Sequence, residues 1–260
     1  LDFKIIDKIA SNNNLEIYKV RYKDKIFIAK GYFKDKFSFE ENYRHFIYAL
    51  NKEANILKKF NNLNINKLFK IIESEDLFFL ILEYVDGLNL FEYLNDNHLS
   101  TSAKHRLIKK IIEIFSTIHN NNVIHGDIHF GNILIQNSEP LIIDFGLSNE
   151  LQDVKCNNGG FPLFMPPERI NGDFLKKHIK SSNLKSDVYQ LGLLIYFILT
   201  LKMPFSSTNW KDLVIEKKNF NLILSDEIDL YYKIIKKCIS TNLSDRYDNA
   251  SEIYNEIIKL

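Results

Sequence analysis

Cysteine is scarce in this sequence, with only Cys156 and Cys238 among 260 residues. Two thiols cannot build the network of disulfides that supports many small secreted domains. Cys238 lies within an apolar, helix-like run and is expected in the core, whereas the residues around Cys156 give no indication of catalysis. The composition therefore favours a reducing compartment, and we expect the protein to be cytoplasmic.

An excess of either charge is also missing, because 34 basic residues face 33 acidic ones and leave a net charge of +1. This balance gives no reason to expect a nucleic-acid partner or binding to an anionic membrane. The longest strongly apolar run, residues 191–201, is about half of the ~20 residues that a helix needs to cross a bilayer. We therefore expect no insertion into a membrane.

The first thirty residues contain no glycine, since all nine glycines of the chain occur from Gly31 onwards. A glycine-rich loop that brings the backbone close to phosphate groups is therefore absent from the N-terminal region. Asparagine is frequent instead, in patches such as residues 12–14 and 120–122. These patches predict turns, because asparagine tolerates left-handed backbone.

The chain does contain a clear change of pattern along its length. Residues 1–82 have short β-like apolar runs and one helical pattern, residues 51–60. Residues 87–260 are mainly helical, with one helix marked by a period near 3.6 in Ile108, Ile111, Ile112, Phe115 and Ile118. At 45% hydrophobic residues, the chain can form a large core or two lobes. These patterns predict an α+β fold with a small β-rich part and a larger helical part.

The most informative motif is His125-Gly126-Asp127-Ile128-His129-Phe130-Gly131-Asn132, followed by Asp144-Phe145-Gly146. It lies among apolar runs typical of short buried strands, residues 123–124, 133–135 and 141–143. Transfer of a γ-phosphoryl group needs positioning and charge neutralisation more than covalent chemistry. Asp127 suits the orientation of an acceptor hydroxyl, and the oxygens of Asn132 and Asp144 suit Mg²⁺. Phe145 is expected to pack inward and Gly146 to let the chain turn.

These motifs resemble the catalytic loop and the metal-binding segment of the protein kinase family. The resemblance implies a two-lobed kinase fold, ATP and Mg²⁺ as cofactors, and Asp127 as the base. It also assigns Lys30, at the end of an apolar run, to the α- and β-phosphates of ATP. Glu53 is the expected partner of Lys30 because it lies within the helical pattern, whereas Glu40 and Glu41 precede the amphipathic segment.

The same resemblance implies an adenine site. Residues 77–87 are typical of a buried strand that leads into the hinge, residues 83–86, between the two kinase lobes. Leu82 would close the back of the adenine pocket, and the backbones of Glu83 and Val85 would meet the adenine edge. Apolar contacts to the nucleotide are expected from four further residues, Ile9, Ile17, Ala29 and Leu134.

Three later segments follow the order of the family: Pro166-Pro167-Glu168, Asp187-Val188-Tyr189-Gln190-Leu191-Gly192 and Ser244-Asp245-Arg246. They resemble the end of the activation segment, the buried helix of the large lobe, and the arginine that pairs with Glu168. Residues 1–260 are therefore expected to form one kinase catalytic domain, with an N-lobe (1–82), the hinge and a C-lobe (87–260). Because the chain starts without Met at the first strand, we expect flanking domains in a longer protein.

Two departures from the family concern phosphate binding and regulation. Ala10, Asn12 and Leu15 occupy the three glycine positions of the family's loop, which predicts a weaker or differently shaped phosphate clamp. Gly126 replaces an arginine that, in the family, usually needs a phosphorylated activation segment. Here that segment, residues 144–168, contains Ser148 but no Thr or Tyr. We therefore expect activity that is not controlled by phosphorylation of the activation segment.

A third departure concerns the acceptor site. His129 stands where Ser/Thr-specific members have a phosphate-steadying lysine, and Phe161 where they have the threonine that contacts this lysine and the catalytic Asp. Histidine carries less positive charge than lysine near neutral pH. The loss of both partners indicates a reworked acceptor site, and a merely local hydrogen bond of His129 is the competing explanation.

The sequence thus predicts an ATP-dependent protein kinase that phosphorylates Ser or Thr hydroxyls of a protein or peptide. Its catalytic residues are Asp127, Lys30, Glu53, Asn132 and Asp144, of which the last two bind the metal. Three alternatives stay open. They are a nucleotide-binding pseudokinase or scaffold, a kinase module of a peptide-modifying enzyme such as a lanthipeptide synthetase, and a small-molecule phosphotransferase of the aminoglycoside or choline kinase type. The glycine-free loop suggests the first, and the His-Gly-Asp-Ile-His phrase also resembles the last.

Overall fold

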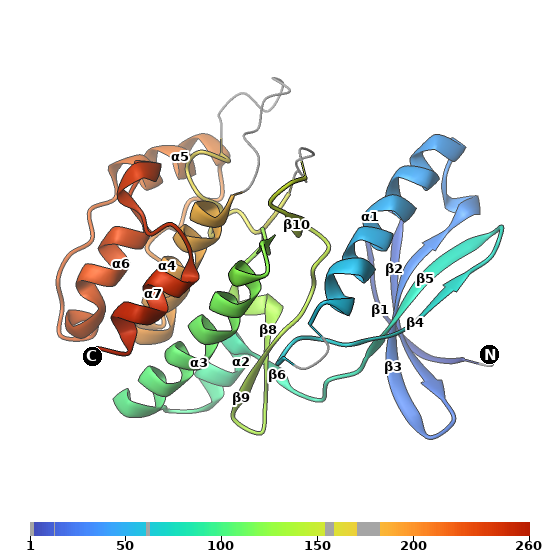
Figure 1. Ribbon diagram of the computed structural model, residues 1–260, viewed down its shortest axis with the longest axis horizontal. Coiled ribbons are helices and arrows are strands. Elements are labelled where there is room, and N and C mark those ends of the chain that lie inside the picture. Colours follow the sequence, from blue (N-terminus) through green and yellow to red (C-terminus); the bar gives the residue numbers. More distant parts are fainter. Residues whose placement is uncertain (1–2, 13, 61–62, 154–158, 171–182) are drawn as a thin grey trace. The chain divides into compact units, whose positions relative to one another are not determined.

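The computed structural model describes residues 3–12, 14–60, 63–153, 159–170 and 183–260, so that Cys156 lies outside the described residues. The chain divides into two compact units, Leu1–Gly87 with Leu141–Gly146 and Leu88–Pro140 with Leu147–Leu260. The first, here called the sheet unit, has a sheet and one long helix, and the second, the helical unit, is mainly helical (Figure 1). The predicted α+β class is confirmed.

The sheet unit contains a five-stranded antiparallel sheet in the order β1-β2-β3-β5-β4. Its strands are β1 (Lys4–Asn12), β2 (Leu15–Tyr22), β3 (Lys25–Phe33), β4 (Leu68–Glu73) and β5 (Leu77–Glu83). One face of this sheet buries an apolar cluster of Val20, Phe27, Ala29, Phe79 and Ile81. Since side chains alternate between the two faces of a strand, the opposite face carries Lys30.

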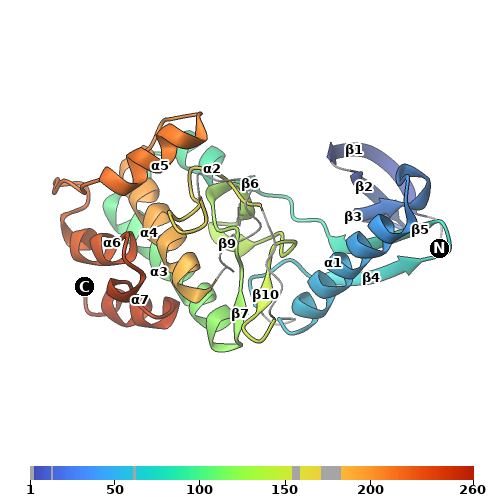
Figure 2. The ribbon, with the colours of Figure 1, turned by 90° about the horizontal axis from the view of Figure 1, so that it is seen from above.

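The helix α1 (Glu40–Lys58) follows β3 after the 3-10 helix η1 (Lys34–Lys36) and runs beside the sheet in both ribbon views (Figures 1 and 2). Its buried side chains repeat at helical spacing, at Tyr43, Leu50, Glu53, Ala54, Ile56 and Leu57. The helix begins well before the predicted pattern 51–60. Glu40 and Glu41 form its first turn, where acidic side chains favour a helix start, so the expectation that they precede the amphipathic segment is wrong.

The helical unit is built around α3 (Thr101–Asn120) and α4 (Leu184–Thr200), with α6 (Tyr232–Cys238) against α4 and α7 (Ala250–Ile257) against α3. The remaining helices are α2 (Leu90–Asp96), α5 (Trp210–Asn219) and the 3-10 helices η3 (Asp229–Tyr231) and η4 (Leu243–Asp245). Almost all of α4 is buried. Gly192 lets α6 approach it, because a Cβ there would lie 2.4 Å from the Cβ of the buried Cys238.

Two small sheets frame the motif that begins at His125. One pairs β7 (Val123–Ile124) with β10 (Asn149–Glu150), and the other joins β6 (Leu88–Asn89), β8 (Ile133–Gln136) and β9 (Glu139–Ile142). The apolar runs of the sequence therefore predict these short strands correctly. The turn between β8 and β9 uses Asn137 and Ser138 with φ of 52° and 64°, the positive angles that a tight hairpin requires. The catalytic motif occupies the connection from β7 through the 3-10 helix η2 (Phe130–Asn132) to β8.

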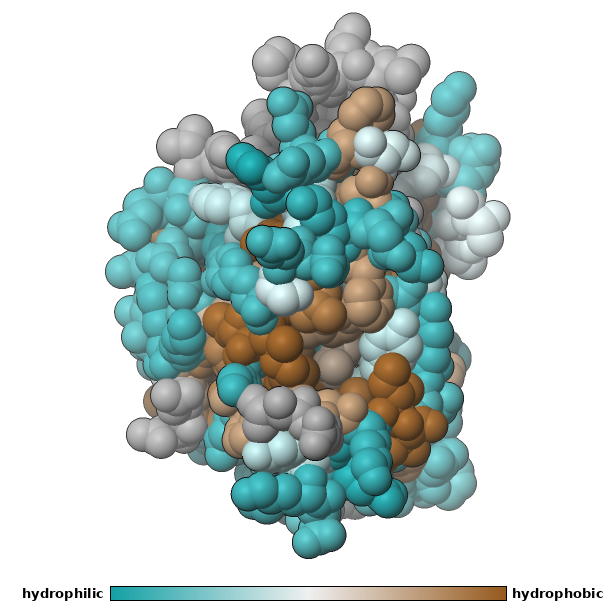
Figure 3. Space-filling view, turned by 90° about the vertical axis from the view of Figure 1, so that its right-hand side faces the viewer, coloured by the Kyte–Doolittle hydropathy of each residue, from teal (hydrophilic) through white to brown (hydrophobic). Residues whose placement is uncertain are grey.

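Apolar side chains also reach the surface of the sheet unit. Strand β1 is exposed along its whole length and includes Ile5 and Ile9, which are 64% and 51% exposed. Figure 3 shows brown apolar patches among hydrophilic residues on the face that it draws.

Among the residues that the structure describes, no helix has the length and apolar character needed to cross a membrane.

A buried ion pair ties two distant segments of the helical unit together. Arg246 Nη2 donates to Glu168 Oε2 at 2.8 Å and Arg246 Nη1 donates to Glu168 Oε1 at 2.9 Å. The two side chains are 0% and 10% exposed. Arg246 also donates to the carbonyls of Ser240 and Lys185, at 2.7 and 2.9 Å. The predicted pair of Glu168 and Arg246 is confirmed, and its low exposure makes it structurally costly to break.

We therefore predict that Arg246→Met lowers the free energy of unfolding by about 3–5 kcal/mol, because it leaves the Glu168 carboxylate buried without its partner. Urea unfolding followed by circular dichroism measures the change. Lys259→Met is the matched control, since Lys259 pairs with Glu256 on the surface and its side chain is 65% exposed. The control should unfold like the unaltered protein, and equal losses in both variants would contradict the assignment.

Candidate active site

In the sheet unit, Lys30 of β3 lies between two carboxylates. Its Nζ donates to Glu53 Oε1 on α1 at 2.8 Å and to Asp144 Oδ1 at 2.7 Å. The side chains of Lys30 and Glu53 are 9% and 1% exposed, whereas that of Asp144 is 48% exposed. Glu40 bonds to Arg44 instead, so the expected choice of Glu53 as the partner of Lys30 is confirmed.

The carboxylates keep Lys30 positively charged. Burial alone would lower the pKa of Lys30, but Asp144 and Glu53 outweigh it and raise the pKa well above its ordinary value. Burial raises the pKa of Glu53, while the Lys30 ammonium opposes this rise. The result is a permanent cation beside an accessible carboxylate, which is the combination that a site for a metal and phosphates requires.

The backbone at Asp144 has a conformation that the sequence pattern does not reveal. Asp144 has a φ of 62°, a left-handed value that is uncommon outside glycine, and its Oδ1 accepts the Gly146 N–H at 3.1 Å. The turn expected at Gly146 is confirmed, since residues 146–147 form a turn directly after this left-handed residue. The space at position 146 is tight, because a Cβ there would lie 3.1 Å from Asp144 Oδ1 and 3.2 Å from Lys30 Nζ. Phe145 packs inward as predicted, at 1% exposure.

The strand register decides which apolar residues accompany Lys30. Ile17 pairs with Lys30 between β2 and β3, and Ile28 pairs with Leu82 between β3 and β5. Paired residues and residues two apart share a face, so these four side chains lie on one face of the sheet. Ala29 points to the opposite face, into the apolar cluster. The expectation that Ala29 lines the same site as Lys30 is therefore corrected, and Ile28 takes its place.

The other residues assigned to the nucleotide are distributed over several elements. Ile9 lies on the exposed strand β1, and Glu83 ends β5 with its N–H bound to the Lys67 carbonyl at 2.9 Å. Val85 follows β5 and is half-buried. Leu134 belongs to β8 of the helical unit and is also half-buried.

The glycine-free hairpin of β1 and β2 is held by its own side chains. Asn14 has a φ of 67°, so asparagine supplies the left-handed residue in the turn. Glu16 is 3% exposed and accepts bonds from Lys8 at 2.7 Å, Ser11 at 3.1 Å and Tyr18 at 3.2 Å. Glu16 is not marked by any motif in the sequence, and a basic residue on the neighbouring strand is only a weak signal. These bonds give the hairpin a fixed shape in place of a flexible loop.

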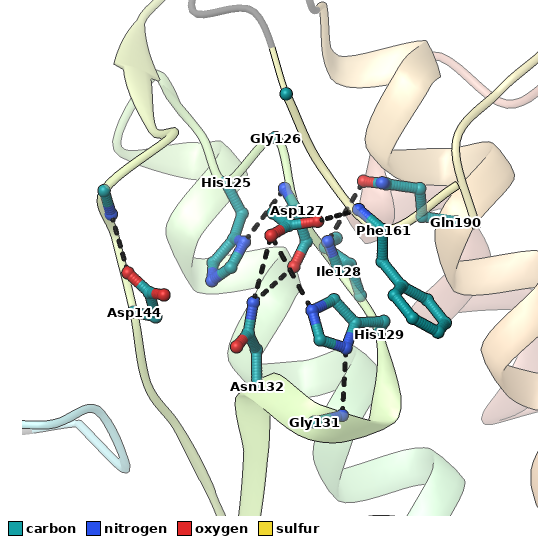
Figure 4. Close-up of polar contacts among 12 residues, drawn as sticks. His125, Gly126, Asp127, Ile128, His129, Gly131, Asn132, Asp144, Phe161 and Gln190 are labelled. Carbon is teal, nitrogen blue, oxygen red and sulfur yellow. Dashed lines mark hydrogen bonds and ion pairs between the residues drawn. The ribbon is translucent and has the colours of Figure 1, made fainter. Parts of the chain in front are cut away.

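In the helical unit, Asp127 is held from three directions (Figure 4). Its Oδ1 accepts the Phe161 N–H at 2.9 Å, and its Oδ2 lies 3.6 Å from His129 Nε2. Asn132 Nδ2 donates to the Asp127 carbonyl at 2.9 Å and lies 3.4 Å from its Oδ2. Because the amide nitrogen of Asn132 faces Asp127, its amide oxygen points away and is the atom that can bind a cation.

His129 is part of this arrangement through both ring nitrogens. Its Nδ1 accepts the Gly131 N–H at 3.0 Å, so its Nε2 faces Asp127 as the donor. The ring of Phe161 lies against that of His129, with centroids 4.9 Å apart. Burial would raise the pKa of Asp127, but the His129 ring and the Phe161 N–H favour the carboxylate and hold the pKa below its ordinary value. His129 therefore makes the local hydrogen bond and also supports Asp127.

The catalytic loop rests on α4. Asp187 accepts the N–H groups of His125 and Gly126 at 2.7 and 2.9 Å, and Gln190 Oε1 accepts that of Ile128 at 3.2 Å. Gly126 has a φ of 80°, which explains a glycine at this position on conformational grounds. Sequence reasoning placed Asp187 and Gln190 on a buried helix but did not reveal these contacts.

Arg169 is a further residue that the sequence analysis missed. It is 4% exposed, and its guanidinium donates to the Gly126 carbonyl at 2.7 Å and to the Gly159 carbonyl at 2.9 Å. The only signal in the sequence is a charged side chain directly after Glu168, next to the apolar Ile170. Arg169 connects the catalytic loop to the segment that carries Phe161.

The donor atoms fit a divalent cation of the hard type. Asp144 offers a carboxylate and Asn132 an amide oxygen, and both atom types suit Mg²⁺, which usually keeps waters and substrate phosphates as further ligands. Within the part of the chain that the structure describes, no cluster of three or more His, Cys, Asp or Glu side chains could hold a metal ion by itself.

Comparison with known proteins agrees with this geometry. The family model described as "Protein kinase domain" matches residues 6–257. A probable serine/threonine-protein kinase KIN1 homolog from Enterocytozoon bieneusi is 31% identical over 229 residues, which cover 80% of this chain and 37% of that protein. The serine/threonine-protein kinase PrkC of Bacillus subtilis is 24% identical over 83% of this chain and 34% of its own length. The human NUAK family SNF1-like kinase 1 is 28% identical over 75% of this chain and 28% of its own length.

The chain spans about a third of the length of the curated relatives that it matches. The matched residues nevertheless include every part of the candidate site, from Lys30 and Glu53 to Asp127, Asn132 and Asp144. The family uses ATP and a divalent metal ion. The resemblance seen in the motifs is confirmed, and the chain belongs to the protein kinase family.

Proposed function

We propose that this chain is a catalytic domain that transfers the γ-phosphoryl group of ATP to Ser or Thr hydroxyls of a protein or peptide. The observation that supports this most is the environment of Asp127, whose carboxylate is bonded to the Phe161 N–H and faces His129. A carboxylate with a lowered pKa stays ionised near neutral pH and can accept the proton of an acceptor hydroxyl. The relatives are named as serine/threonine kinases, which supports the choice of acceptor.

In this proposal residues of the sheet unit make most of the contacts to the nucleotide. Lys30, fixed by Glu53, neutralises the α- and β-phosphates, and Ile17, Ile28 and Leu82 supply apolar contacts to adenine. Ile9, Leu134 and the backbones of Glu83 and Val85 complete the nucleotide contacts. Asn132 and Asp144 would hold Mg²⁺, which when bound neutralises charge on the transferred phosphoryl group.

We further propose that activity does not depend on phosphorylation of the activation segment. Ser148, its one hydroxyl residue, is 0% exposed and donates to the His125 carbonyl at 2.9 Å, so a kinase cannot reach it in the folded protein. Arg169 holds the Gly126 and Gly159 carbonyls together, which supplies from within the chain the kind of bridge that a phosphate and an arginine would otherwise make.

A second candidate is a pseudokinase that binds nucleotide without turnover. The hairpin of β1 and β2 favours it, because Glu16 ties Lys8, Ser11 and Tyr18 together and the three glycine positions are occupied by larger residues. Such a hairpin brings its backbone less closely to phosphate groups than a glycine-rich loop does. The presence of both Lys30 and Asp127 favours an active kinase over a pseudokinase.

The wider setting of the domain is also a proposal. Residues 1–260 would act as one catalytic domain within a longer protein that has flanking domains, with ATP and a protein or peptide as partners and no nucleic acid. The buried free thiol of Cys238 suits a reducing, cytoplasmic location.

We predict that Asp127→Asn and Lys30→Met each reduce phosphoryl transfer by at least about 100-fold, because they remove the base and the phosphate cation. Transfer is measured with radiolabelled ATP and Mg²⁺ on a generic protein, a Ser/Thr peptide library and a small amino alcohol. Asp96→Asn and Lys70→Met are the matched controls, since both residues are exposed. Both controls should keep full activity.

Two results would contradict the proposal in different ways. Nucleotide binding without any Asp127-dependent transfer would support the pseudokinase. Transfer to the amino alcohol alone would remove the protein acceptor while keeping the chemistry.

We predict that His129→Ala shifts the acid limb of the kcat/KM profile to higher pH. His129 favours the Asp127 carboxylate, so without this ring burial raises the pKa of Asp127 and the base is lost at a higher pH. The profile is measured from about pH 3 to about pH 8, because the ordinary pKa of Asp is about 4 and that of Asp127 is lower. His98→Ala, at an exposed loop position, is the control and should keep the original limb. An unmoved limb in His129→Ala would show that this histidine does not act on Asp127.

We predict that treatment with a protein phosphatase leaves the activity unchanged, whereas Arg169→Met lowers kcat/KM by about 100-fold because the segment at Phe161 loses its bridge. Arg44→Met is the control, since Arg44 makes an exposed pair with Glu40. Mass spectrometry of the untreated protein should find no phosphate on Ser148. Loss of activity after dephosphorylation would contradict the proposal.

A further inference from the structure

Lys217 is a buried lysine that the proposed mechanism does not use. It lies in α5 and is 2% exposed, which is rare for a lysine. The next residue of the same helix, Lys218, is exposed. Burial of an ammonium group is costly unless its N–H groups find acceptors, so the contacts of Lys217 indicate its role.

The acceptors of Lys217 are two backbone carbonyls. Its Nζ donates to the carbonyl of Leu163 at 2.6 Å and to that of Met165 at 2.9 Å. Aromatic faces surround the same nitrogen, with the Phe205 ring centroid at 4.3 Å and that of Tyr189 at 5.5 Å. This setting is favourable for a cation, because carbonyl oxygens and ring faces both carry negative partial charge.

A continuous series of hydrogen bonds leads from Lys217 to Asp127. Met165, whose carbonyl accepts from Lys217, donates its own N–H to the Phe161 carbonyl at 3.0 Å. The Phe161 N–H in turn donates to Asp127 Oδ1 at 2.9 Å. The Phe164 N–H also bonds to the Phe161 carbonyl at 3.0 Å, so residues 161–165 form one compact turn between Lys217 and the base.

Lys217 is also set to respond to pH. Burial lowers its pKa to about 7, and the carboxylates of Glu168 and Glu216 oppose this shift. Tyr189 faces the same ammonium, and Arg246 lies over the Tyr189 ring at 4.8 Å. The ammonium form makes stronger, charge-assisted bonds to carbonyls than the neutral amine does. The hold on residues 161–165 should therefore weaken as the pH rises through about 7.

We propose that Lys217 is a positioning residue for the acceptor site, which fixes the turn of residues 161–165 and through Phe161 the geometry of Asp127. The proposal rests on the function proposed above, since a held turn matters for catalysis only if Asp127 acts on an acceptor. It makes α5 part of the acceptor machinery, although no residue of α5 touches Asp127.

The test compares Lys217→Met with Lys218→Met, which removes the same charge from the neighbouring, exposed position. Lys217→Met should raise the KM for the protein or peptide acceptor by about tenfold, the effect of losing two hydrogen bonds, and leave the KM for ATP unchanged. Lys217→Arg keeps the cation and should recover part of the loss. Lys218→Met should behave like the unaltered protein in both constants.

A second measurement does not depend on turnover. Hydrogen exchange followed by mass spectrometry should show faster exchange in residues 161–168 of Lys217→Met and no change in Lys218→Met. Equal exchange and equal acceptor KM in the two variants would overturn the positioning role. If the unaltered protein shows no Asp127-dependent transfer, the proposed function fails, and the exchange result still decides whether Lys217 holds the turn.

The pH dependence of the unaltered protein tests the proposal even if Lys217→Met does not fold. In the unaltered protein the acceptor KM should rise as the pH increases through about 7, because Lys217 loses its charge there. Lys218→Met should show the same rise. A flat acceptor KM across this range, together with unchanged exchange of residues 161–168, would count against the proposal.

Discussion

The catalytic loop depends on the buried carboxylate of Asp187. This side chain is 0% exposed, so it is stable only if donors surround it, and it accepts the N–H groups of His125 and Gly126 and a bond from His119 Nε2 at 3.1 Å. His119 is itself oriented, because its Nδ1 accepts the Ala250 N–H at 2.9 Å. One charge at the start of α4 therefore joins α3, α7 and the backbone directly before Asp127. The left-handed backbone at Gly126 presents its N–H to that charge, and its carbonyl turns to Arg169.

Where this chain lacks residues that are usual in its family, contacts to backbone groups take their place. Arg169 and Lys217 both bind backbone carbonyls of the segment between Gly159 and Met165. Carbonyl acceptors are always present, whereas a phosphate group has to be added by another enzyme. His129 and Phe161 follow the same principle, since a ring nitrogen and a backbone N–H stabilise Asp127 where a lysine and a threonine are absent. Residues 159–165 are thus held by contacts within the chain.

Contacts between two side chains that both belong to motifs could be predicted from the sequence. Contacts between a side chain and a backbone carbonyl could not. Lys30 with Glu53, and Glu168 with Arg246, could be paired because each residue type and its spacing are informative. Arg169 and Lys217 bind carbonyls, which every residue possesses, so no pattern in the sequence marks their partners. The wrong prediction for Ala29 has another cause. A strand motif identifies neighbours along the chain, but only the register of β3 with β2 and β5 shows which of them share a face with Lys30.

The two lysines show how burial and partners together determine the chemistry of one side-chain type. Lys30 is buried between two carboxylates, which raise its pKa and keep it positively charged, as its proposed role in phosphate binding requires. Lys217 is buried against neutral carbonyls and rings, with Glu168 and Glu216 acting only through space, so burial dominates and lowers its pKa to about 7. Full charge pairing suits a group that must remain charged during catalysis. Neutral acceptors suit a group whose task is to hold a turn, because either protonation state can donate to a carbonyl and only the strength of the hold changes.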